Sequence, residues 1–567
     1  MRDRGFFLCA LFVVGAFGCG ERPTDRDDTD AVLSISPPTT ELVVFNGVPA
    51  NQDYTATLTY GDGFVEDVTG DTVFSVDSAF GTFQGAKVAI STAGKTTVYG
   101  QLVDKVGTAE IIARVKSVRV DETLDPSTPD LFGGPEDPAI APLVLYPADD
   151  VMMPRNLGDF ETHWIDSSGN NVFEVSLQTE FSDVRVYVPG GNGNAAAGPM
   201  ASFSSFLAAE WLAAVGRQPN VRYQVRGVNT ANPTSVGAAP ARTVQLTNET
   251  LEGGLYYWAA ASTTGPDGIY RHDMGKPGQQ AEEYMTRNQT SGRCVACHVL
   301  SRDGTKMAIT YDGGDSLATM VDVATGTRQT DFARWNFATF SADGNQILTV
   351  HQGVLTVRGS TDQAALTTMP AAGYVSHPDM SADGTKLVYV RAPQGSDWEF
   401  STGHLYTRSY DATTMTFGAE VPLITDGGNN FYPSWSPDGE WVLFNRDVNN
   451  GDAYDNTGAQ LFVVKADGSA APIPLGAANE ASGLTNSWGR WAPFQQTIGI
   501  NSEPLFWVTV SSKRDFGVRL VGANRPQIWM TPFFPSRASQ AADPTVSAFR
   551  LPFQNIEGNN HIAQWTE

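Results

Sequence analysis

Cysteine, histidine and basic residues are scarce in this sequence, and each shortage narrows the protein classes that it fits. The 567 residues include four cysteines, seven histidines and 37 lysines and arginines, against 62 aspartates and glutamates. The formal net charge of −25 repels phosphate backbones, so no nucleic-acid partner is expected. Motifs of serine hydrolases, zinc proteases and nucleotide-binding loops are absent from the sequence.

Long stretches of helical periodicity are also missing. The apolar runs are short and are interrupted by Asn, Asp, 56 glycines and 33 prolines. These features predict a mostly β protein. Because the chain is too long for a single hydrophobic core, several domains are expected.

The only apolar run near the N-terminus is a targeting segment. Arg2 and Arg4 precede the apolar residues 6–17, which are too few to serve as a spanning helix. The run ends in Ala-Phe-Gly-Cys, which resembles a bacterial lipobox. The resemblance implies that residues 1–19 are a lipoprotein signal sequence and that Cys19 is lipidated and anchors an exported protein to a membrane. An ordinary signal peptide with an incidental cysteine is the alternative.

The residues after the lipobox suggest where the anchor resides. Neither Gly20 nor Glu21 is the aspartate that commonly signals inner-membrane retention, so the outer membrane is favoured. Residues 20–30 are polar and are expected to form a flexible tether.

The remaining cysteines form one motif. Cys9 is removed with the signal and Cys19 carries lipid, which leaves only Cys294 and Cys297 in the segment CVACH. Two thiols at this spacing can bond the two vinyl-derived carbons of one porphyrin, with His298 beneath the iron as its proximal ligand. In an exported chain this pattern predicts one covalent haem c.

Two other interpretations of the motif were weighed. A zinc site needs four ligands, and there is no second CxxC. A thioredoxin-type redox pair should follow a strand within a βαβ pattern, which this sequence lacks. Haem attachment is therefore favoured.

Two β-sandwich modules are predicted before the motif. Residues 31–120 alternate apolar and polar positions between short turns, and the segment YGDGFVEDVTGDTVFSV resembles bacterial immunoglobulin-like modules. Residues 121–139, rich in Pro, Asp and Gly, are expected to be a linker. Residues 140–250 resemble a fibronectin type III sandwich, with Trp164 as a core aromatic and one helical segment, SFLAAEWLAAVG.

The rest of the chain repeats itself. Ser-x-Asp-Gly turns followed by apolar strands begin at Ser301, Ser341, Ser381 and Ser436. These repeats resemble the TolB-like β-propellers, whose blades share a WSPDG signature. The resemblance implies a six-bladed propeller over residues 251–567, so the expected fold is all-β, with two sandwiches followed by the propeller. Its inner strands would be 298–300, 337–340, 377–380, 432–435, 488–491 and 561–565.

The ends of this propeller are expected to join. The last inner strand lies at the end of the sequence, so its outer strands are expected to come from earlier in the chain, and two apolar segments within residues 255–274 are suitable. Aligning the repeats places His298 on Pro433, so the haem is expected over one mouth of the central channel. The chain also resembles the haem-bearing propeller domain of the hydrazine synthase large subunit. That activity is not expected here, because the chain has a single haem motif.

Several residues are candidates for the second axial ligand. His377 and His561 fall in equivalent loops leading into the inner strands of blades three and six. Pro378 stiffens the loop of His377, which ranks His377 first as a ligand and His561 first as a distal acid–base group. His272 and Met274 are further candidates, whereas a core position is expected for Met380 and structural or exposed positions for His351 and His404, and His163 lies in another module.

Two further segments could bind a haem propionate or a metal ion. Arg302 and Asp303 could contact haem propionates, although the turn alone accounts for Asp303. The loop 447–458 offers hard oxygen ligands that could hold calcium, but it lacks the calcium-hand pattern, so a solvated loop is the favoured interpretation. The oxygen ligands would be Asp447, Asn449, Asp452 and Asp455.

Three functions fit these predictions. The favoured one is electron transfer at the cell envelope through a single haem, with a redox protein as partner. The second is a haem-dependent oxidoreductase acting on a small molecule or peroxide at an open iron position. The third is a TolB-like protein-binding propeller in which the haem is structural or sensory.

Overall fold

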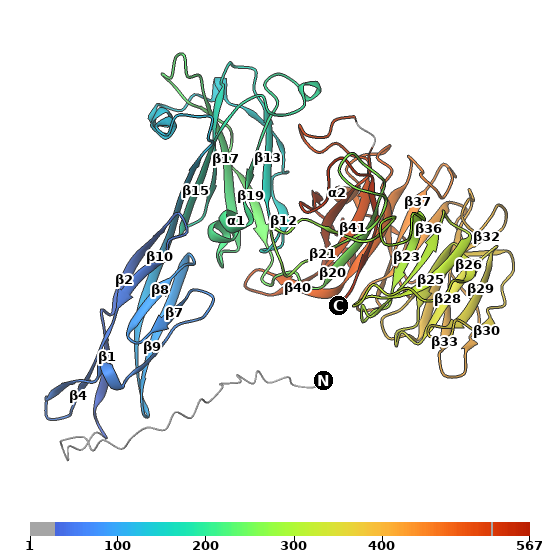
Figure 1. Cartoon of the computed structure of the whole chain (residues 1–567), viewed down its shortest axis with the longest axis horizontal. Helices are drawn as coiled ribbons and strands as arrows, with labels where there is room; N and C mark the ends of the chain where they lie inside the picture. The colour runs from blue at the N-terminus through green and yellow to red at the C-terminus, as the bar shows by residue number, and fades with distance from the viewer. Residues whose placement is uncertain (1–28, 523–524) are drawn as a thin grey trace. The chain divides into compact units, whose positions relative to one another are not determined.

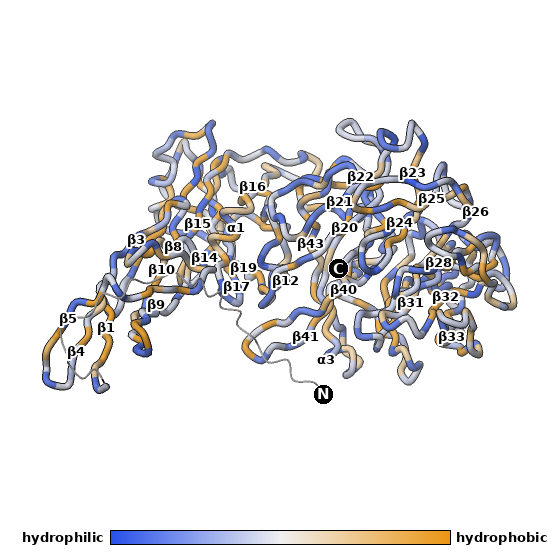
Figure 2. Tube along the Cα trace, turned by 60° about the horizontal axis from the view of Figure 1, so that its bottom comes forward, coloured by the Kyte–Doolittle hydropathy of each residue, from blue (hydrophilic) through white to orange (hydrophobic). Residues whose placement is uncertain are grey.

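The computed structural model describes residues 29–522 and 525–567 (Figure 1). The signal sequence expected at 1–19, the lipidation site Cys19 and most of the tether expected at 20–30 lie outside the described residues. The chain is all-β, with 49% of it in strands and 6% in helices. Hydrophobic and hydrophilic segments alternate over short distances along the trace (Figure 2). Among the described residues, no helix is long and apolar enough to cross a membrane.

The first compact unit contains most of the described residues up to Ile112. Its strands alternate between buried and exposed side chains, as in β1, where Leu33 and Ile35 are buried. Two sheets have the orders β1-β4-β5 and β3-β8-β7, and β9 pairs with β6. The elements are β1 (Val32–Ser36), β2 (Thr39–Phe45), β3 (Ala50–Asp53), β4 (Thr55–Thr59), β5 (Val65–Asp67), η1 (Thr69–Asp71), β6 (Val73–Ser75), β7 (Gly81–Gln84), β8 (Lys87–Ile90) and β9 (Gly94–Leu102).

The second compact unit contains Ala113–Glu567 and two short earlier stretches, Leu42–Ala50 and Ser91–Gly94. The boundary expected at residue 120 therefore falls earlier, inside the long strand β10 (Lys105–Val120). The last residues of β10 run parallel to β15 (Ser182–Pro189), with which they pair. A boundary inside a strand leaves no turn residues to mark it in the sequence.

Residues 140–250 form two sheets and one helix. The strand orders are β12-β19-β17-β14-β15 and β11-β13-β16. Trp164 is fully buried, as expected, and the helix α1 (Ala208–Val215) lies where the sequence predicted one. The other elements are β11 (Leu143–Tyr146), β12 (Val151–Met153), β13 (Phe160–Ile165), β14 (Val172–Gln178), η4 (Ala195–Ala197), β16 (Ser202–Phe206), β17 (Asn220–Val228), β18 (Gly237–Ala238) and β19 (Arg242–Leu246).

Residues 121–139, the expected linker, pack against the module that follows them. They contain the short helix η2 (Thr128–Gly133) and lead into η3 (Pro138–Ile140). Phe132 of η2 is buried against Tyr187 and Val228 of the module that follows. An aromatic anchor within a Pro- and Gly-rich segment therefore ties the segment to the second module.

Six antiparallel sheets of four or five strands follow (Figure 1). Their innermost strands contact one another in sequence, from β23 through β27, β31, β36 and β40 to β44, which returns to β23. This closed succession of sheets is a β-propeller. Three of these sheets are formed by consecutive strands from β23 to β35. The strands are β23 (Val295–Leu300), β24 (Lys306–Tyr311), β25 (Ser316–Asp322), β26 (Phe332–Trp335), β27 (Phe337–Phe340), β28 (Gln346–His351), β29 (Val354–Gly359), β30 (Ala365–Thr368), β31 (Tyr374–Met380), β32 (Lys386–Ala392), β33 (His404–Asp411), β34 (Thr416–Phe417) and β35 (Val421–Ile424).

The remaining sheets complete and close the ring. The C-terminal strand β44 (Asn560–Trp565) pairs with β20 (Gly254–Ala259), which comes about three hundred residues earlier. Strand β44 is therefore the innermost strand of the sheet that also contains β20, β21 and β22, and the ring is closed. The other elements are β21 (Gly268–Asp273), β22 (Glu282–Thr286), β36 (Asn429–Trp435), β37 (Trp441–Asp447), β38 (Gln460–Lys465), β39 (Ile473–Pro474), α2 (Gly476–Asn479), β40 (Ser487–Ile498), β41 (Glu503–Ser512), β42 (Gln527–Phe533), α3 (Pro535–Ala538) and β43 (Phe549–Arg550).

The Ser-x-Asp-Gly repeats are turns between the two innermost strands of four sheets. In one of them, Ser341 Oγ donates to the Asp343 carboxylate at 2.6 Å and accepts from the Gln346 amide at 3.0 Å. The glycines of the four turns, Gly304, Gly344, Gly384 and Gly439, have φ between 66° and 72°. Side-chain hydrogen bonds and a left-handed glycine therefore hold each turn, as the repeat predicted.

We expect Gly439→Ala to lower the free energy of unfolding of the propeller by about 1 kcal/mol, because alanine resists the left-handed backbone. An added Cβ would meet no atom within 4 Å, so the cost is conformational and not steric. Denaturant titration measures it. Gly439→Asn is the control and should cost clearly less, since Asn tolerates this conformation; equal costs for Ala and Asn would contradict the explanation.

Candidate functional site

Most of the innermost strands contain a β-bulge at one mouth of the central channel. In five of the six sheets this strand carries one extra residue relative to its partner at this mouth. At this point His377, Tyr432, Trp488 and Ile562 have φ between 44° and 58°. Such a backbone costs a non-glycine residue about 1–2 kcal/mol and is concentrated at functional sites. In the repeat register, Cys297 of β23 occupies the same position.

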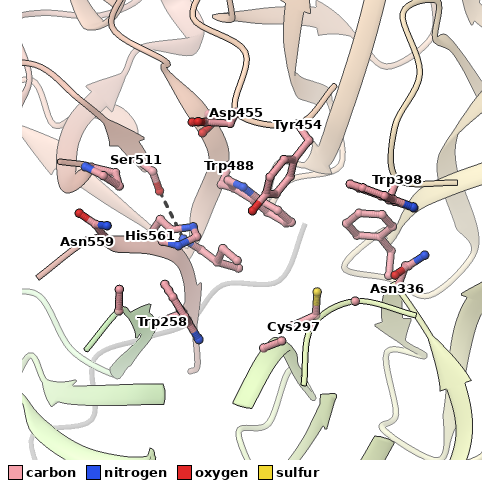
Figure 3. Close-up of a pocket in the computed structure, with 18 of the residues that line it drawn as sticks. Trp258, Cys297, Asn336, Trp398, Tyr454, Asp455, Trp488, Ser511, Asn559 and His561 are labelled. Atoms are coloured by element: carbon pink, nitrogen blue, oxygen red, sulfur yellow. Dashed lines mark hydrogen bonds between the residues drawn. The ribbon is translucent and has the colours of Figure 1, made fainter. Parts of the chain in front are cut away.

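A cavity of about 790 Å³ opens at this mouth (Figure 3). Its volume lies within the range of ~300–1,000 Å³ that is usual for small-molecule and cofactor sites. The lining is mostly apolar and comes from all six sheets and their loops. The aromatic lining residues are Trp258, Phe337, Trp398, Tyr454 and Trp488.

The two cysteines of the CVACH motif both line this cavity. The thiols of Cys294 and Cys297 are free, and Figure 3 shows the sulfur of Cys297 within the cavity. Burial raises the pKa of both thiols to about 11, with Asp267 adding to the effect at Cys294. Both thiols are therefore protonated at neutral pH and face a common apolar space.

His298 follows Cys297 in β23 but does not line the large cavity. Its side chain lines a smaller cavity of about 30 Å³ inside the channel, which Cys297 also lines. His298 is 4% exposed, and neither ring nitrogen has a hydrogen-bond partner. Burial, with a smaller contribution from His561, lowers the pKa of His298 to about 3, so the imidazole is neutral. A buried imidazole with two unpaired nitrogens is costly unless one of them binds a ligand or metal.

His561 also lines the large cavity. It lies within strand β44, not in a loop before the strand as the repeat alignment predicted. Its ring meets that of Trp258 edge to face, with the centroids 4.8 Å apart (Figure 3). Burial lowers the pKa of His561 to about 4, so this imidazole is neutral near pH 7.

His377 lies elsewhere, although the sequence placed it in an equivalent position. It too lies inside a strand, β31, and it lines the smaller channel cavity with His298 and not the large one. Its ring packs between those of Phe337 and Tyr432, with centroids 4.1 and 4.2 Å away. Burial holds the pKa of His377 well below its usual value. His561 therefore lies in the large cavity that both cysteines line, whereas His377 shares the smaller cavity with Cys297 and His298.

The other ligand candidates do not line either cavity. His272 stacks on Phe553 at 3.9 Å, and Met274 is buried near the second module, where its carbonyl accepts from Asn156. Met380 lines a third cavity of about 130 Å³ at the far end of the channel, as does Arg302. Arg302 pairs with Glu567 at 3.0 Å and lies at the opposite mouth, so it does not face the cysteines.

The remaining histidines have structural surroundings. His163 is buried and contacts Glu161 through Nε2 at 3.0 Å. His351 pairs with Asp315, and His404 begins strand β33. Neither His351 nor His404 lines the large cavity or the smaller channel cavity, and His163 lies in the second module, as the sequence indicated.

The loop 447–458 forms part of the cavity wall. The Asp447 carboxylate accepts from the backbone amides of Asn449 and Gly451 and from the Asn456 side chain, at 2.7–3.1 Å. Over the described residues, no group of three or more His, Cys, Asp or Glu side chains is placed to hold a metal ion. The oxygens of Asp447 thus stabilise the loop itself, and Tyr454 from this loop lines the cavity.

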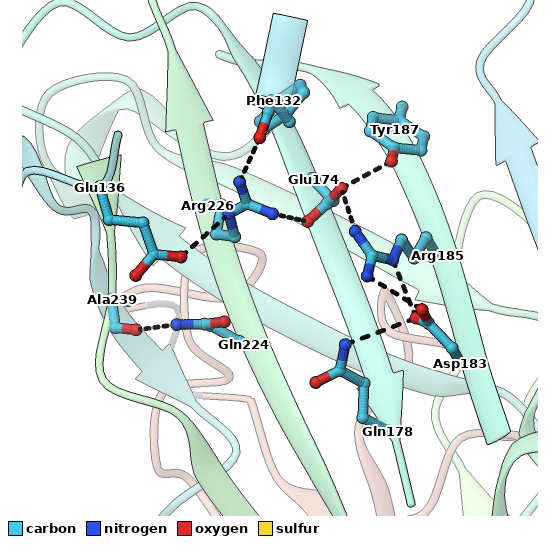
Figure 4. Close-up of polar contacts among 10 residues, drawn as sticks. All are labelled: Phe132, Glu136, Glu174, Gln178, Asp183, Arg185, Tyr187, Gln224, Arg226 and Ala239. Atoms are coloured by element: carbon cyan, nitrogen blue, oxygen red, sulfur yellow. Dashed lines mark hydrogen bonds and ion pairs between the residues drawn. The ribbon is translucent and has the colours of Figure 1, made fainter. Parts of the chain in front are cut away.

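A second polar cluster, in the second module, is structural (Figure 4). The buried Glu174 carboxylate contacts Arg226 at 2.9 Å and Arg185 at 3.2 Å and accepts from Tyr187 at 2.6 Å. Its negative charge is therefore balanced by two cations, which is the arrangement a buried carboxylate needs.

Sequence reasoning did not identify the aromatic and polar residues of the cavity wall. Phe337 and Trp488 could have been found, because the repeat register aligns them with Cys297. Trp258, Trp398 and Lys513 lie outside the repeats, so no sequence signal marks them.

No family model matches the chain, and no curated protein is found to match it. Among solved structures it is similar to TolB from Acinetobacter baumannii, at 13% identity and a TM-score of 0.38, over 61% of this chain and 79% of that one. It is also similar to a putative TolB from Agrobacterium tumefaciens, at 13% identity and a TM-score of 0.31, over 56% of this chain and 99% of that one. A third similar structure is Kuenenia stuttgartiensis hydrazine synthase, at 12% identity and a TM-score of 0.24, over 39% of this chain and 76% of that one. The site is therefore interpreted from its own geometry.

We expect Cys294 and Cys297 to react slowly with iodoacetamide in the folded chain, because only the thiolate reacts. A pKa near 11, against the ordinary thiol value of 9.0, reduces the thiolate fraction at pH 8 about 100-fold. Alkylation kinetics of a chain carrying unmodified cysteines measure this effect. The rate should rise about tenfold per pH unit below pH 11, and denaturant should abolish the protection; equal rates in the folded and denatured chain would contradict the burial of the thiols.

Proposed function

We propose that this protein is a c-type cytochrome of the bacterial cell envelope, which transfers electrons through one haem held covalently at the mouth of a six-bladed TolB-like propeller. The observation that carries the proposal is the arrangement of the CVACH motif. Cys294 and Cys297 open into one apolar cavity, and the adjacent His298 is buried with both ring nitrogens unpaired. This donor set fits haem c, which needs two thiols on one edge and an imidazole below the iron.

Each residue has a distinct role in this proposal. Cys294 and Cys297 would form the thioether bonds, and His298 would bind the iron from the channel side. The aromatic walls exclude water, which favours a flat apolar cofactor. When bound, haem supplies reversible one-electron chemistry.

The rim of the cavity supports exchange of electrons with a partner protein. Trp398 and Tyr454 line the cavity and are 42% and 54% exposed, and their ring centroids are 6.1 Å apart. A cofactor in the cavity would thus have an edge close to the surface. The net charge of −25 favours a basic redox partner, because opposite charge accelerates encounter.

The N-terminal sequence supports a location at the membrane. The lipobox ending at Cys19 would anchor the chain, with the outer membrane favoured by Gly20 and Glu21. The two β modules that precede the propeller would then serve as a spacer between the lipid and the haem.

A second candidate, a haem-dependent oxidoreductase, is favoured by one observation. His561 lies in the cavity as a neutral imidazole beside Trp258, so it could accept a proton from a small molecule such as a peroxide bound there. The two functions differ in whether His561 binds the iron or stays free as a base.

We expect Cys294→Ser or Cys297→Ser to remove one thioether bond and to reduce covalent haem, and the double variant to abolish it. Haem-peroxidase staining after denaturing electrophoresis measures this in cells with a haem-attachment system. Ala296→Ser, which places a hydroxyl between the two cysteines, is the matched control and should stain like the wild type. A wild-type band without haem stain would refute the proposed function.

We expect His561→Ala to change the Soret band of the oxidised protein and its binding of carbon monoxide or cyanide, because His561 shares the cavity with the cysteines. His377→Ala should change these spectra less, since His377 lies within the channel, and His404→Ala in an outer strand is the control. A low-spin wild type that becomes high-spin in His561→Ala supports electron transfer. A high-spin wild type that binds these ligands favours the oxidoreductase, and loss of the low-spin state only in His377→Ala would assign the ligand to His377.

A further inference from the structure

The polar groups of the large cavity are unevenly distributed. Thr485, Ser487, Ser511 and Lys513 all lie where strands β40 and β41 begin and end, so one sheet supplies four hydrogen-bonding side chains. The wall near β23, β27 and β20 instead presents mostly apolar groups, notably Ala296, Phe337 and Trp258, and its polar side chains are Asp315, Asn336 and Asn559, one from each of three sheets. We call the first set, Thr485, Ser487, Ser511 and Lys513, the polar wall.

Thr485 is unusual within the polar wall. Its side chain is 4% exposed, and its hydroxyl has no hydrogen-bond partner. The residue also has φ of 50°, a conformation that β-branched residues rarely adopt. Buried hydroxyls are nearly always paired, so a group that enters the cavity would supply the partner that this hydroxyl lacks, as it would for the unpaired Asn336 amide in the same lining. Strain and an unpaired donor at one residue indicate a ligand-binding position.

Lys513 provides the charge of the polar wall. Among the described residues that line the cavity, it is the only cationic side chain, since His561 is neutral. Lys513 is 14% exposed and contacts Asp455 at 2.7 Å, whereas Asp455 is 58% exposed and largely hydrated. An ammonium group has three donors, so Lys513 can hold Asp455 and still donate into the cavity. A hydroxyl and an ammonium together fit an anionic oxygen ligand.

The two edges of a haem c differ in the same way as the walls of this cavity. The thioether bonds lie on one edge of the porphyrin, and the two propionates extend from the opposite edge. We propose that the polar wall is a carboxylate-binding subsite that receives the propionate edge, with Thr485 and Lys513 as the direct donors. This inference rests on the proposed haem and deepens it, because it defines how the cofactor is oriented across the channel mouth.

The test uses the holoprotein and follows its reduction potential as a function of pH. A nearby cation favours ionised propionates and lowers their pKa. Lys513→Met should therefore raise the propionate pKa, read from the pH dependence of the reduction potential, by about one unit, which is a tenfold shift in the proton affinity. Because the variant also removes a positive charge near the haem, it should lower the reduction potential itself. Thr485→Val should shift this pKa in the same direction. Lys465→Met is the matched control, because Lys465 pairs with Glu440 outside the cavity, and it should leave both quantities unchanged.

A second measurement isolates the carboxylates. The haem-free full-length chain should bind haem about tenfold more tightly than haem dimethyl ester, and Lys513→Met should remove this preference while Lys465→Met keeps it. Equal affinity for both forms in the wild type, or an unchanged pKa in both Lys513→Met and Thr485→Val, would overturn the inference even if covalent haem staining is intact. A wild type that shows no haem stain instead overturns the proposed function, and the inference with it.

Discussion

One extra residue near the start of an innermost strand decides which side chains reach the channel mouth. Side chains of a regular strand alternate between its two faces, so the strand alone cannot turn a residue toward the ring axis. The extra residue interrupts this alternation, and the left-handed backbone of His377, Tyr432 and Trp488 is its cost. In β23 the same extra residue lies between Val295 and His298 and lets Cys297 line the large cavity, while His298 lines the smaller cavity inside the channel.

Burial then sets the chemistry of these groups. The interior has a low effective dielectric, so it favours neutral forms: thiols with a pKa near 11 and imidazoles with pKa values near 3 and 4. Neutral imidazoles retain the lone pairs that bind iron or accept a proton. The mouth therefore concentrates groups suited to a cofactor while its walls remain apolar, and charge is confined to the Lys513–Asp455 pair and Asp315 at the rim.

Closure of the ring links this site to the whole chain. The pairing of β44 with β20 brings the C-terminal His561 beside Trp258 and next to the sheet that carries the CVACH motif. The site is thus assembled from residues separated by about three hundred positions. Its geometry depends on the sheets between them, because the innermost strands contact one another in turn around the ring.

The sequence by itself determined the local chemistry: the all-β composition, the repeated turns, the paired cysteines with the following histidine, and the two strands at 255–274 that β44 needs. These depend on residues close together in the chain, as in the Ser341–Asp343 turn. Only the tertiary structure decided that Phe132 anchors an expected linker, that Arg302 lies at the far mouth, and that His561 rather than His377 lines the large cavity. Residues at equivalent repeat positions have similar backbone conformations but different neighbouring side chains. The direction and burial of each side chain therefore depend on packing between sheets, which a local sequence pattern does not indicate.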